Sequence, residues 1–473
     1  MNAHARWHGA PLTTRALVCI ALAGAGSASV AARAATIDEL QSQIEALRKQ
    51  VTELEAKSAR TPKDGGAGVN AAGASANVVT GGAGVNAAGA SANVVTGGAT
   101  KGSFKLPGSD TSITLGGYVK LDAVYSNPSA GVDNAGDLSL NPASIPVGPN
   151  AGDHERNQVK LGARETRLFV KTNTPTVLGD LDTHVEFDFY GADGNESVSN
   201  SHGLRLRHAY ATLGHFLAGQ TWTNFMNPAA LPETVDFGGP VGQIFDRQAQ
   251  ARWTQAFGPS GFATGGRWSV GLENPETVAQ LQTGGTFRAD DDRIPDVTGQ
   301  IAFDTPRGTY SVHAVARQLG VDSGSAPAAV DRKVGAALSV TGVVPALGKD
   351  DVRFTASAGN AIGRYVDGFF PDAVIDAGGR LALPRQWAGF AAYRHFWRDD
   401  LRSSLVLSMA GASNPAGAPA TTNKSTKSLH VNLIWSPVAR SDLGVEYIYA
   451  DRETQDGLTG HLNRLQAAAK YSF

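Results

Sequence analysis

Hydrophobic and polar residues alternate along the last stretch of the chain. From Leu465 to Phe473 one face carries Leu, Ala, Ala, Tyr and Phe, and the other face carries Gln, Ala, Lys and Ser. A repeat of two residues is typical of a β-strand. The apolar face includes the C-terminal Phe473, and such a ring suits the interfacial aromatic girdle of a transmembrane barrel. This segment therefore predicts a strand with one face toward lipid.

The same alternation recurs throughout residues 103–473. We expect sixteen strands of about ten residues, at 113–125, 158–172, 180–190, 204–213, 216–226, 246–257, 266–273, 295–304, 309–319, 333–342, 351–360, 386–397, 401–411, 427–436, 442–452 and 462–473. Long and short connections alternate, as external loops and periplasmic turns do in outer-membrane barrels. The pattern predicts an all-β fold, a closed antiparallel transmembrane β-barrel, and leaves about two strands more or fewer open. Two soluble sandwich domains are the alternative, which does not account for this alternation.

Residues 1–35 have the form of a signal peptide. Arg6 and Arg15 precede an apolar stretch at 16–25, and small residues around Ala34 provide a cleavage site. The apolar stretch is too short to cross a bilayer as a helix. We therefore expect the exported protein to start near Ala35.

Residues 36–57 predict a coiled-coil oligomerisation helix. Apolar side chains occupy the a and d positions of about three heptads, namely Ile37, Leu40, Ile44, Leu47, Val51 and Leu54. A lone amphipathic helix on a barrel or lipid surface is the alternative. The heptads alone do not distinguish a trimer from other oligomers.

Residues 58–102 predict a flexible linker rich in Gly and Ala. The sixteen-residue sequence GAGVNAAGASANVVTG occurs twice in tandem, from 66 to 97. Such a composition buries too little apolar surface to fold alone, so we expect a periplasmic linker in front of the barrel. Two turns of a β-solenoid are the alternative, although more repeats are usually needed for stability.

Composition narrows the class of protein further. No stretch after residue 25 approaches the roughly 18 to 20 apolar residues of a membrane helix. The single cysteine, Cys19, lies in the predicted leader, so the exported chain can form no disulfide and no thiolate metal site. Loss of the leader's three arginines changes the formal net charge from -2 to -5, which argues against nucleic acid as a partner. We expect no cofactor and no bound metal.

Charged side chains on the polar faces are candidates for the lining of a lumen. They are Arg167, Lys171, Glu186, Asp188, Arg205, Arg207, Arg252, His313 and Arg317. Arg205 and Arg207 give the sharpest signal, because two guanidinium groups on one face can each bind a carboxylate through two hydrogen bonds. Unpaired cations would favour anionic solutes. The alternative is that these arginines pair with acids of neighbouring strands, namely Glu165, Glu186, Asp188 or Glu273, and only stiffen the wall.

The connection at 227–245 is a candidate constriction loop. It is rich in Pro and Gly and carries apolar residues that could anchor it inside a barrel. Pro232, Glu233 and Asp236 of this loop would then narrow the lumen. An ordinary external loop is the alternative. The acidic run at 290–292 is more often a solvated charge run than a divalent-cation site.

Catalytic motifs are missing from the sequence. There is no G-x-S-x-G elbow, no H-E-x-x-H pair, no phosphate-binding loop and no cysteine pair, and the 11 histidines are scattered. We therefore expect that the protein is not an enzyme.

Several segments resemble the DcaP-like outer-membrane porins. The resemblance rests on GSFKLPGSDTSITLGGYVKLDAVYS at 102–126, TRLFVKTNTPT at 166–176, LRLRHAYATLG at 204–214 and GQTWTNFMNPAALPETVDF at 219–237. It implies a homotrimer of sixteen-stranded barrels in the outer membrane of a Gram-negative bacterium, in contact with lipid and lipopolysaccharide. It also implies passage of small solutes, in some members dicarboxylic or aromatic acids. The tandem repeat departs from the family pattern.

Two functions follow as hypotheses. The first is a porin for passive diffusion of small anionic solutes through an arginine-lined lumen. The second is a structural or adhesive barrel whose lumen is plugged and whose long outer loops, such as 126–157, bind a partner.

Overall fold

The computed structural model describes residues 49, 96–128, 138–149, 151, 156–191, 194–195, 199–289, 291–323 and 329–473. The chain divides into two compact units, Met1–Asn86 and Ala87–Phe473, and every described strand belongs to the second. The predicted signal peptide, most of the coiled-coil helix and the linker up to residue 95 lie outside the described residues, so these expectations remain predictions. No helix within the described ranges is long and apolar enough to span a membrane.

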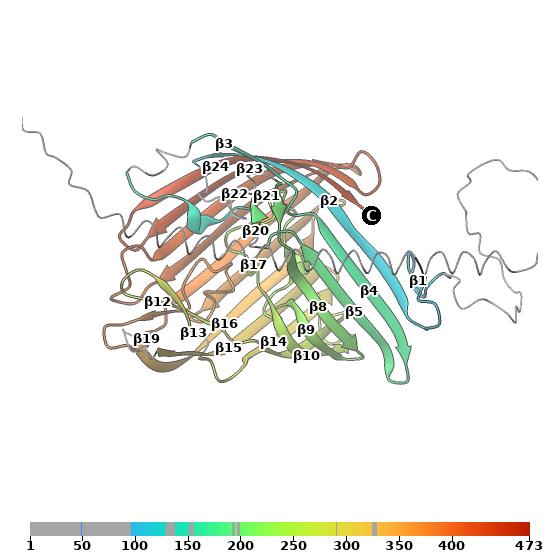
Figure 1. Cartoon of the computed structure of the whole chain (residues 1–473), viewed down its shortest axis with the longest axis horizontal. Coiled ribbons are helices and arrows are strands. Elements are labelled where there is room, and N and C mark those ends of the chain that lie inside the picture. Colours follow the sequence, from blue (N-terminus) through green and yellow to red (C-terminus); the bar gives the residue numbers. More distant parts are fainter. Residues whose placement is uncertain are drawn as a thin grey trace, which may run out of the picture. The chain divides into compact units, whose positions relative to one another are not determined.

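A closed antiparallel barrel dominates the second unit (Figure 1). Its sheet has 18 strands, of which β1 and β3 lie beside β2 and the other 16 form the barrel. The barrel strands are β2 (Ser112–Asn127), β4 (Arg167–Thr176), β5 (Gly179–Asp188), β8 (Arg205–Leu213), β9 (Phe216–Trp222), β10 (Arg247–Phe257), β11 (Gly265–Glu273), β14 (Asp296–Thr305), β15 (Gly308–Ser323), β16 (Ala329–Pro345), β17 (Asp351–Gly359), β20 (Arg385–Arg398), β21 (Leu401–Ser413), β22 (Asn423–Trp435), β23 (Ser441–Thr454) and β24 (Thr459–Ser472). Each pairs with the next along the chain, and β24 closes the barrel on β2.

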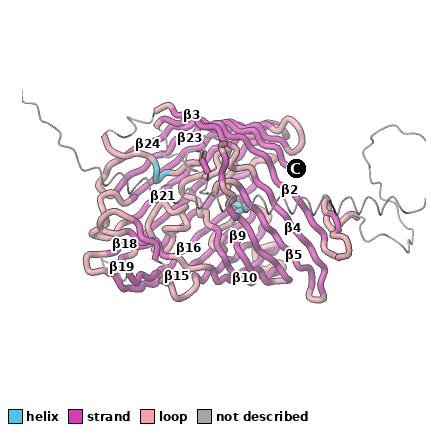
Figure 2. The backbone as a smooth tube through the Cα atoms, viewed as in Figure 1, coloured by secondary structure: helices cyan, strands magenta, loops and turns pink. Residues whose placement is uncertain are grey.

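The remaining described elements are short (Figure 2). They are β1 (Phe104–Lys105), β3 (Gln158–Gly162), β6 (Gly194–Asn195), β7 (Ser201–His202), β12 (Thr277–Gln280), β13 (Thr286–Ala289), β18 (Ala373–Ile375), β19 (Leu381–Ala382) and the 3-10 helices η2 (Pro142–Ser144) and η3 (Pro228–Ala230). Strands β12, β13, β18 and β19 form a small separate sheet, in which β12 and β18 run parallel. The predicted all-β barrel of sixteen strands is confirmed.

The two-residue alternation explains which faces of the strands lie outside. On β24 the side chains of Leu465 and Tyr471 are 49% and 53% exposed, whereas Gln466 between them is buried. Similar rows of exposed Leu, Val, Trp and Tyr occur on the other barrel strands. Polar side chains fill the inner faces, as expected when the outer surface meets acyl chains.

One predicted strand, 158–172, is interrupted. Strands β3 and β4 both pair with β2, and residues 163–166 between them leave the ladder. Thr166 Oγ1 accepts the backbone N–H of Lys120 at 3.2 Å, and the Lys120 ammonium binds the Glu165 carboxylate and, at 2.8 Å, the Val235 carbonyl. Hydrogen bonds to side chains therefore replace the missing backbone hydrogen bonds between the strands. The alternation of apolar and polar residues does not reveal this interruption.

Two long connections fold into the barrel and carry its apolar core. One joins β9 to β10, and the other, residues 360–384, joins β17 to β20. The largest buried apolar cluster unites Phe225, Met226 and Ile244 from the first with Ile362, Tyr365, Val366, Phe369 and Phe370 from the second. It rests on small inward residues of the wall, among them Ala337, Ala388 and Ala410. The sequence predicted one inward loop, so the second insertion was missed, and it fills part of a lumen that was expected to be open.

Candidate functional site

The predicted constriction loop, 227–245, crosses the barrel and is bound to the opposite wall. The backbone N–H groups of Val235 and Asp236 donate to the Glu446 carboxylate of β23 at 2.8 and 3.3 Å. The Asn432 amide of β22 donates to the Glu233 carbonyl at 2.8 Å. The loop therefore lies inside the barrel and is not an ordinary external loop.

Glu233 ties this loop to two further strands. Both of its carboxylate oxygens accept from Arg402 of β21, at 2.6 to 2.9 Å, and Arg394 of β20 lies 3.3 Å away. Burial alone would raise the pKa of Glu233, but the bonds from Arg402 and the charges of both arginines lower it below its usual value. Glu233 thus remains an anion, and its ion pairs attach the loop to β20 and β21.

Asp236 and Pro232 have supporting positions in the same loop. Asp236 is buried and accepts from the backbone N–H groups of Leu140 and Gly239, each at 2.9 Å. Pro232 is half-buried beside Leu231, whose carbonyl accepts from Arg353 at 2.7 Å. These contacts organise the loop, so Asp236 is not accessible to a passing solute.

Gly242 allows the loop to touch the wall directly. Its N–H donates to Ser408 Oγ at 2.7 Å, and a Cβ atom there would lie 2.4 Å from the carbonyl oxygens of Gly389 and Met409. We expect Gly242→Val to displace the loop, to lower the free energy of unfolding by about 1–3 kcal/mol through overpacking, and to increase single-channel conductance. Conductance and chemical denaturation measure both effects. An unaltered conductance in the folded variant would mean that this contact does not hold the constriction.

Two predicted pore-lining residues, Arg317 and His313, anchor the insertions instead. Arg317 is fully buried and binds Asp296 of β14 at 3.0 Å and Asp372 of the second insertion at 2.7 Å. His313 is also fully buried, with Nδ1 2.9 Å from the Asn224 carbonyl. Both point inward as predicted, but the inserted segments cover them, so neither can contact a solute in the lumen.

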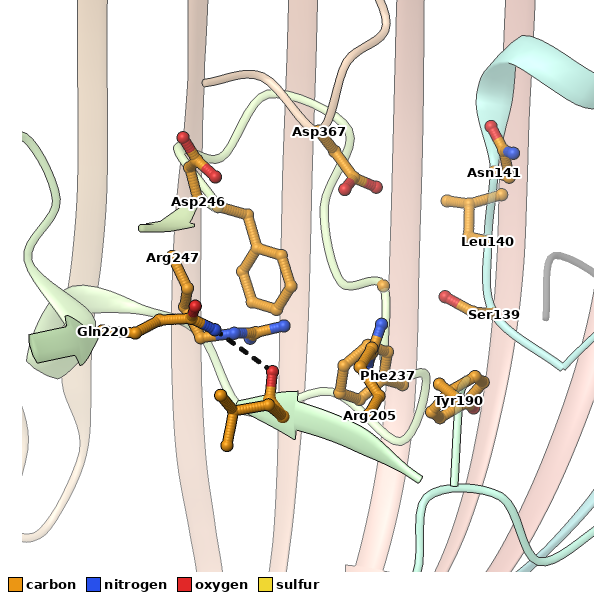
Figure 3. A pocket seen from close by; sticks show the side chains of 13 residues that line it. Ser139, Leu140, Asn141, Tyr190, Arg205, Gln220, Phe237, Asp246, Arg247 and Asp367 are labelled. Atoms are coloured by element: carbon orange, nitrogen blue, oxygen red, sulfur yellow. Dashed lines mark hydrogen bonds between the residues drawn. The ribbon is translucent and has the colours of Figure 1, made fainter. Parts of the chain in front are cut away.

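A cavity of about 400 Å³ remains beside the inserted segments (Figure 3). It is lined by Ser139, Leu140, Asn141, Tyr190, Arg205, Leu206, Gln220, Phe237, Gly238, Phe245, Asp246, Arg247 and Asp367. Arg205 and Arg247 lie on one side, and Asp246 and Asp367 lie on the other (Figure 3). The cavity is the narrowed part of the lumen that we identify as the candidate site.

The predicted arginine pair is bound to the predicted acids of the neighbouring strand. Arg205 donates two hydrogen bonds to the Asp188 carboxylate, from Nε at 2.9 Å and from one terminal nitrogen at 2.7 Å. Arg207 donates one hydrogen bond to Glu186 at 2.7 Å and one to Asp188 at 3.0 Å. Arg167 lies 3.5 Å from Glu186. A β-bulge places Arg207 and His208 together on the inner side. Side-chain exposure is 32% for Arg205 and 3% for Arg207, so mainly Arg205 faces the cavity.

Aromatic rings separate the guanidinium groups of this wall. Arg205 lies 5.0 Å from the Tyr190 ring and 5.3 Å from Phe237, and Arg247 lies 4.5 Å from Trp222 and 5.6 Å from Phe245. Such contacts attract a guanidinium group to the ring face and hold the planar groups in position. The arginines and rings together form one rigid basic and aromatic surface.

Arg247 is a site residue that the sequence analysis missed. Strict alternation in 246–257 assigns Gln248, Gln250 and Arg252 to the inner face and would place Arg247 outside. Arg247 is the first residue of β10, where alternation no longer applies, and its side chain enters the cavity. Among the described residues it makes no ion pair, and its buried Nε and one terminal nitrogen lack hydrogen-bond partners. Its position two residues after Phe245, whose ring it contacts, was the available signal.

Lys171 and Arg252 lie on inner faces but outside this cavity. Lys171 is exposed, and its ammonium lies 5.0 Å from the Phe169 ring. Arg252 is half-buried on β10. The structure thus brings Arg167, Glu186, Asp188, Arg205 and Arg207 together and leaves these two cations separate.

The described part of the acidic run, Asp291 and Asp292, caps a strand end. Asp292 accepts from Thr277 Oγ1 at 2.7 Å and from the Gly320 N–H at 2.9 Å, and Asp291 accepts from the Asp322 N–H at 2.7 Å. Within the described ranges no group of three or more His, Cys, Asp or Glu residues could hold a metal ion. These acids therefore bind backbone N–H groups near the C-terminal end of β15, which pairs with β16 on its other edge.

Comparison with solved structures finds other outer-membrane proteins. The crystal structure of the outer membrane channel DcaP of Acinetobacter baumannii is 25% identical, with a TM-score of 0.67, over 80% of this chain and 100% of that one. The anion-selective porin of Comamonas acidovorans is 12% identical, with a TM-score of 0.47, over 77% and 100%. OmpT of Vibrio cholerae is 11% identical, with a TM-score of 0.47, over 77% and 98%.

Among curated proteins none matches the chain significantly. The family described as DcaP outer membrane protein matches residues 83–259 and 380–473, more than half of the chain. These residues include β8, β9, the inserted loop and Arg247, as well as the strands β20 to β24 that receive the loop. The resemblance noted in the sequence is thereby confirmed, and the chain belongs to the DcaP outer membrane protein family of channels.

Proposed function

We propose that this outer-membrane channel passes small hydrophilic solutes by passive diffusion and favours anions. Arg247 carries the proposal, because its guanidinium enters the narrowed lumen without an acidic partner among the described residues. Arg205 adds a second partly exposed cation on the same wall. A fixed cation at a constriction lowers the barrier for solutes of opposite charge.

The solutes that suit this wall are carboxylic acids, including aromatic and dicarboxylic acids. Guanidinium groups bind carboxylates through two parallel hydrogen bonds. The rings of Tyr190, Phe237 and Phe245 line the same cavity and offer apolar contact to the body of the solute. Each solute is held by several modest contacts, which allows it to leave again.

The assembly that we propose is a homotrimer in the outer membrane. After removal of the signal peptide, the helix at 36–57 would associate in the periplasm and the linker at 58–102 would join it to the barrel. The exposed apolar side chains of the outer wall, such as Leu465 and Tyr471, suit contact with lipid and lipopolysaccharide. We expect no catalytic activity from such a channel.

A plugged structural or adhesive barrel is the second candidate. The apolar cluster formed by the second insertion favours it, because this cluster fills part of the lumen. Conductance in planar bilayers separates the two: stepwise currents support a channel, and a silent barrel supports the alternative.

Replacement of Arg247 tests the anion preference. We expect Arg247→Gln to lower the ratio of chloride to potassium permeability by about fivefold, since a unit charge at contact distance is worth roughly 1 kcal/mol even in water. The measurement is the reversal potential in a KCl gradient. Arg380→Gln is the matched control, because Arg380 is 72% exposed and does not line the cavity. Equal reversal potentials for wild type and Arg247→Gln would contradict the proposal.

A further inference from the structure

The cavity carries an acidic side opposite its arginines. Asp367 belongs to the second insertion, and Asp246 ends the connection between β9 and β10. Both carboxylates lie across the cavity from Arg205 and Arg247 (Figure 3). Acids in this cavity do not favour the passage of anions, so their position needs a separate explanation.

Asp367 is presented to the cavity by an unusual backbone conformation. Its φ is 48°, in the left-handed region that few residues other than Gly, Asn and Asp adopt. The neighbouring Val366 and Phe369 are buried in the apolar cluster, whereas Asp367 itself is exposed. Among the described residues its carboxylate makes no hydrogen bond and no ion pair. The turn therefore directs an unpaired acid into the cavity, and structural pairing does not explain it.

Asp246 gives the same side a second acid, whose charge Arg364 neutralises in part. One of its oxygens is buried without a hydrogen-bond partner, and the nearest guanidinium atom, Arg364 Nε, is 4.0 Å from it. Arg247, which follows it in the chain, has unsatisfied nitrogens on the opposite side. The acidic side of the cavity thus has a carboxylate oxygen without a hydrogen-bond donor, and the basic side has guanidinium nitrogens without an acceptor.

We propose that the cavity is a dipolar binding site that favours zwitterionic amino-carboxylates over anions of the same size. The solute carboxylate would lie against Arg247 and Arg205, and the solute ammonium group would lie against Asp367 and Asp246. The volume of about 400 Å³ is within the range of small-molecule pockets. A dicarboxylate can still bind Arg247 and Arg205 through one carboxylate, but its second negative group would lie near Asp367, where like charges repel, so a zwitterion of the same length is favoured over it. This inference rests on the proposed channel function and specifies the class of solute.

The test compares matched solutes in Asp367→Asn. γ-Aminobutyrate, butyrate and succinate have four carbons each and differ in charge, and their entry into proteoliposomes can be followed by swelling. Asn tolerates the left-handed conformation, so the variant removes charge and keeps the turn. We expect the rate of γ-aminobutyrate relative to butyrate to fall about five- to tenfold, and the relative rate of succinate to rise.

Asp376→Asn is the matched control in the same insertion. Its side chain accepts backbone hydrogen bonds from Gly378 and Arg380, which an Asn oxygen can also accept, and it does not line the cavity. Unchanged solute ratios in Asp367→Asn, or an equal change in Asp376→Asn, would overturn the inference. Failure of the anion-channel proposal would instead appear as an unselective reversal potential in the wild type.

Acidification offers a second readout of the same site. Although water reaches the carboxylate, the surrounding protein desolvates it and raises the pKa of Asp367 to about 6, against the opposing effect of Arg205 and Arg247. The negative charges of Asp246 and Asp236 also raise it. The γ-aminobutyrate preference should therefore be lost below about pH 6 in the wild type. Asp367→Asn should show a smaller pH dependence, and an identical dependence would contradict the assignment to Asp367.

Discussion

Arg317→Met is expected to release the second insertion and to widen the channel. Arg317 joins the wall to the insertion by binding Asp296 and Asp372, and it also donates to the Ala361 carbonyl at 3.1 Å. Removal of one partner from a buried ion network leaves uncompensated charges and costs about 3–5 kcal/mol. Methionine replaces the apolar stem of arginine but lacks the guanidinium group that binds the two carboxylates.

Single-channel conductance and chemical denaturation measure this effect. We expect a larger unit conductance and a lower free energy of unfolding. Arg380→Met is the matched control, since an exposed ion pair such as Arg380–Asp376 contributes about 0–1 kcal/mol at most. Wild-type conductance together with wild-type stability in Arg317→Met would show that the network does not hold the insertion.

Simultaneous neutralisation of Arg205 and Arg207 is expected to shift the channel toward cations. Arg205→Gln with Arg207→Gln leaves Glu186 and Asp188 without their strongest partners, so the wall changes from basic to acidic. We expect the chloride-to-potassium permeability ratio to fall by about tenfold or more. Uptake of dicarboxylates should slow in parallel.

The control for this pair is Arg205→Lys with Arg207→Lys. Lysine retains the charge but cannot bind a carboxylate through two parallel hydrogen bonds. Selectivity for anions should therefore remain, whereas the orientation of the bound carboxylate should be less well defined. The reversal potential in a KCl gradient decides the outcome. An unchanged potential in the glutamine variant would refute the role of these arginines in selectivity.

The barrel could be predicted from the sequence because its strands face two different solvents. Alternation on β24, for example, places Leu465 toward lipid and Gln466 toward the interior, and no tertiary packing overrides that pattern. The inward position of the 227–245 loop could also be predicted, since apolar residues in a long connection need a place to be buried. These features depend on local composition.

The rest depends on contacts between distant segments. The second insertion also lies in a long connection and contains several apolar residues, namely Ile362, Tyr365, Val366, Phe369 and Phe370. Their apolar character was a signal for this insertion, but the search for alternating strands did not detect it. The pairing of Arg205 with Asp188 follows from strand register and from the bulge at Glu186 and Phe187. Alternation alone gives neither, and it assigns Arg247 to the wrong side.

The attachment of the inserted loop has a consequence for the biogenesis of the protein. The Val235 carbonyl accepts from Lys120 of β2 at 2.8 Å and from Gln466 of β24 at 3.5 Å, the first and the last barrel strands. The two donors lie side by side only after β24 has paired with β2 and closed the barrel. An assembly intermediate in which β2 and β24 are not yet paired therefore lacks part of the binding site for the loop. We therefore expect the loop to reach its final position only after the barrel has closed, and an incompletely closed barrel to conduct without the constriction that the loop provides.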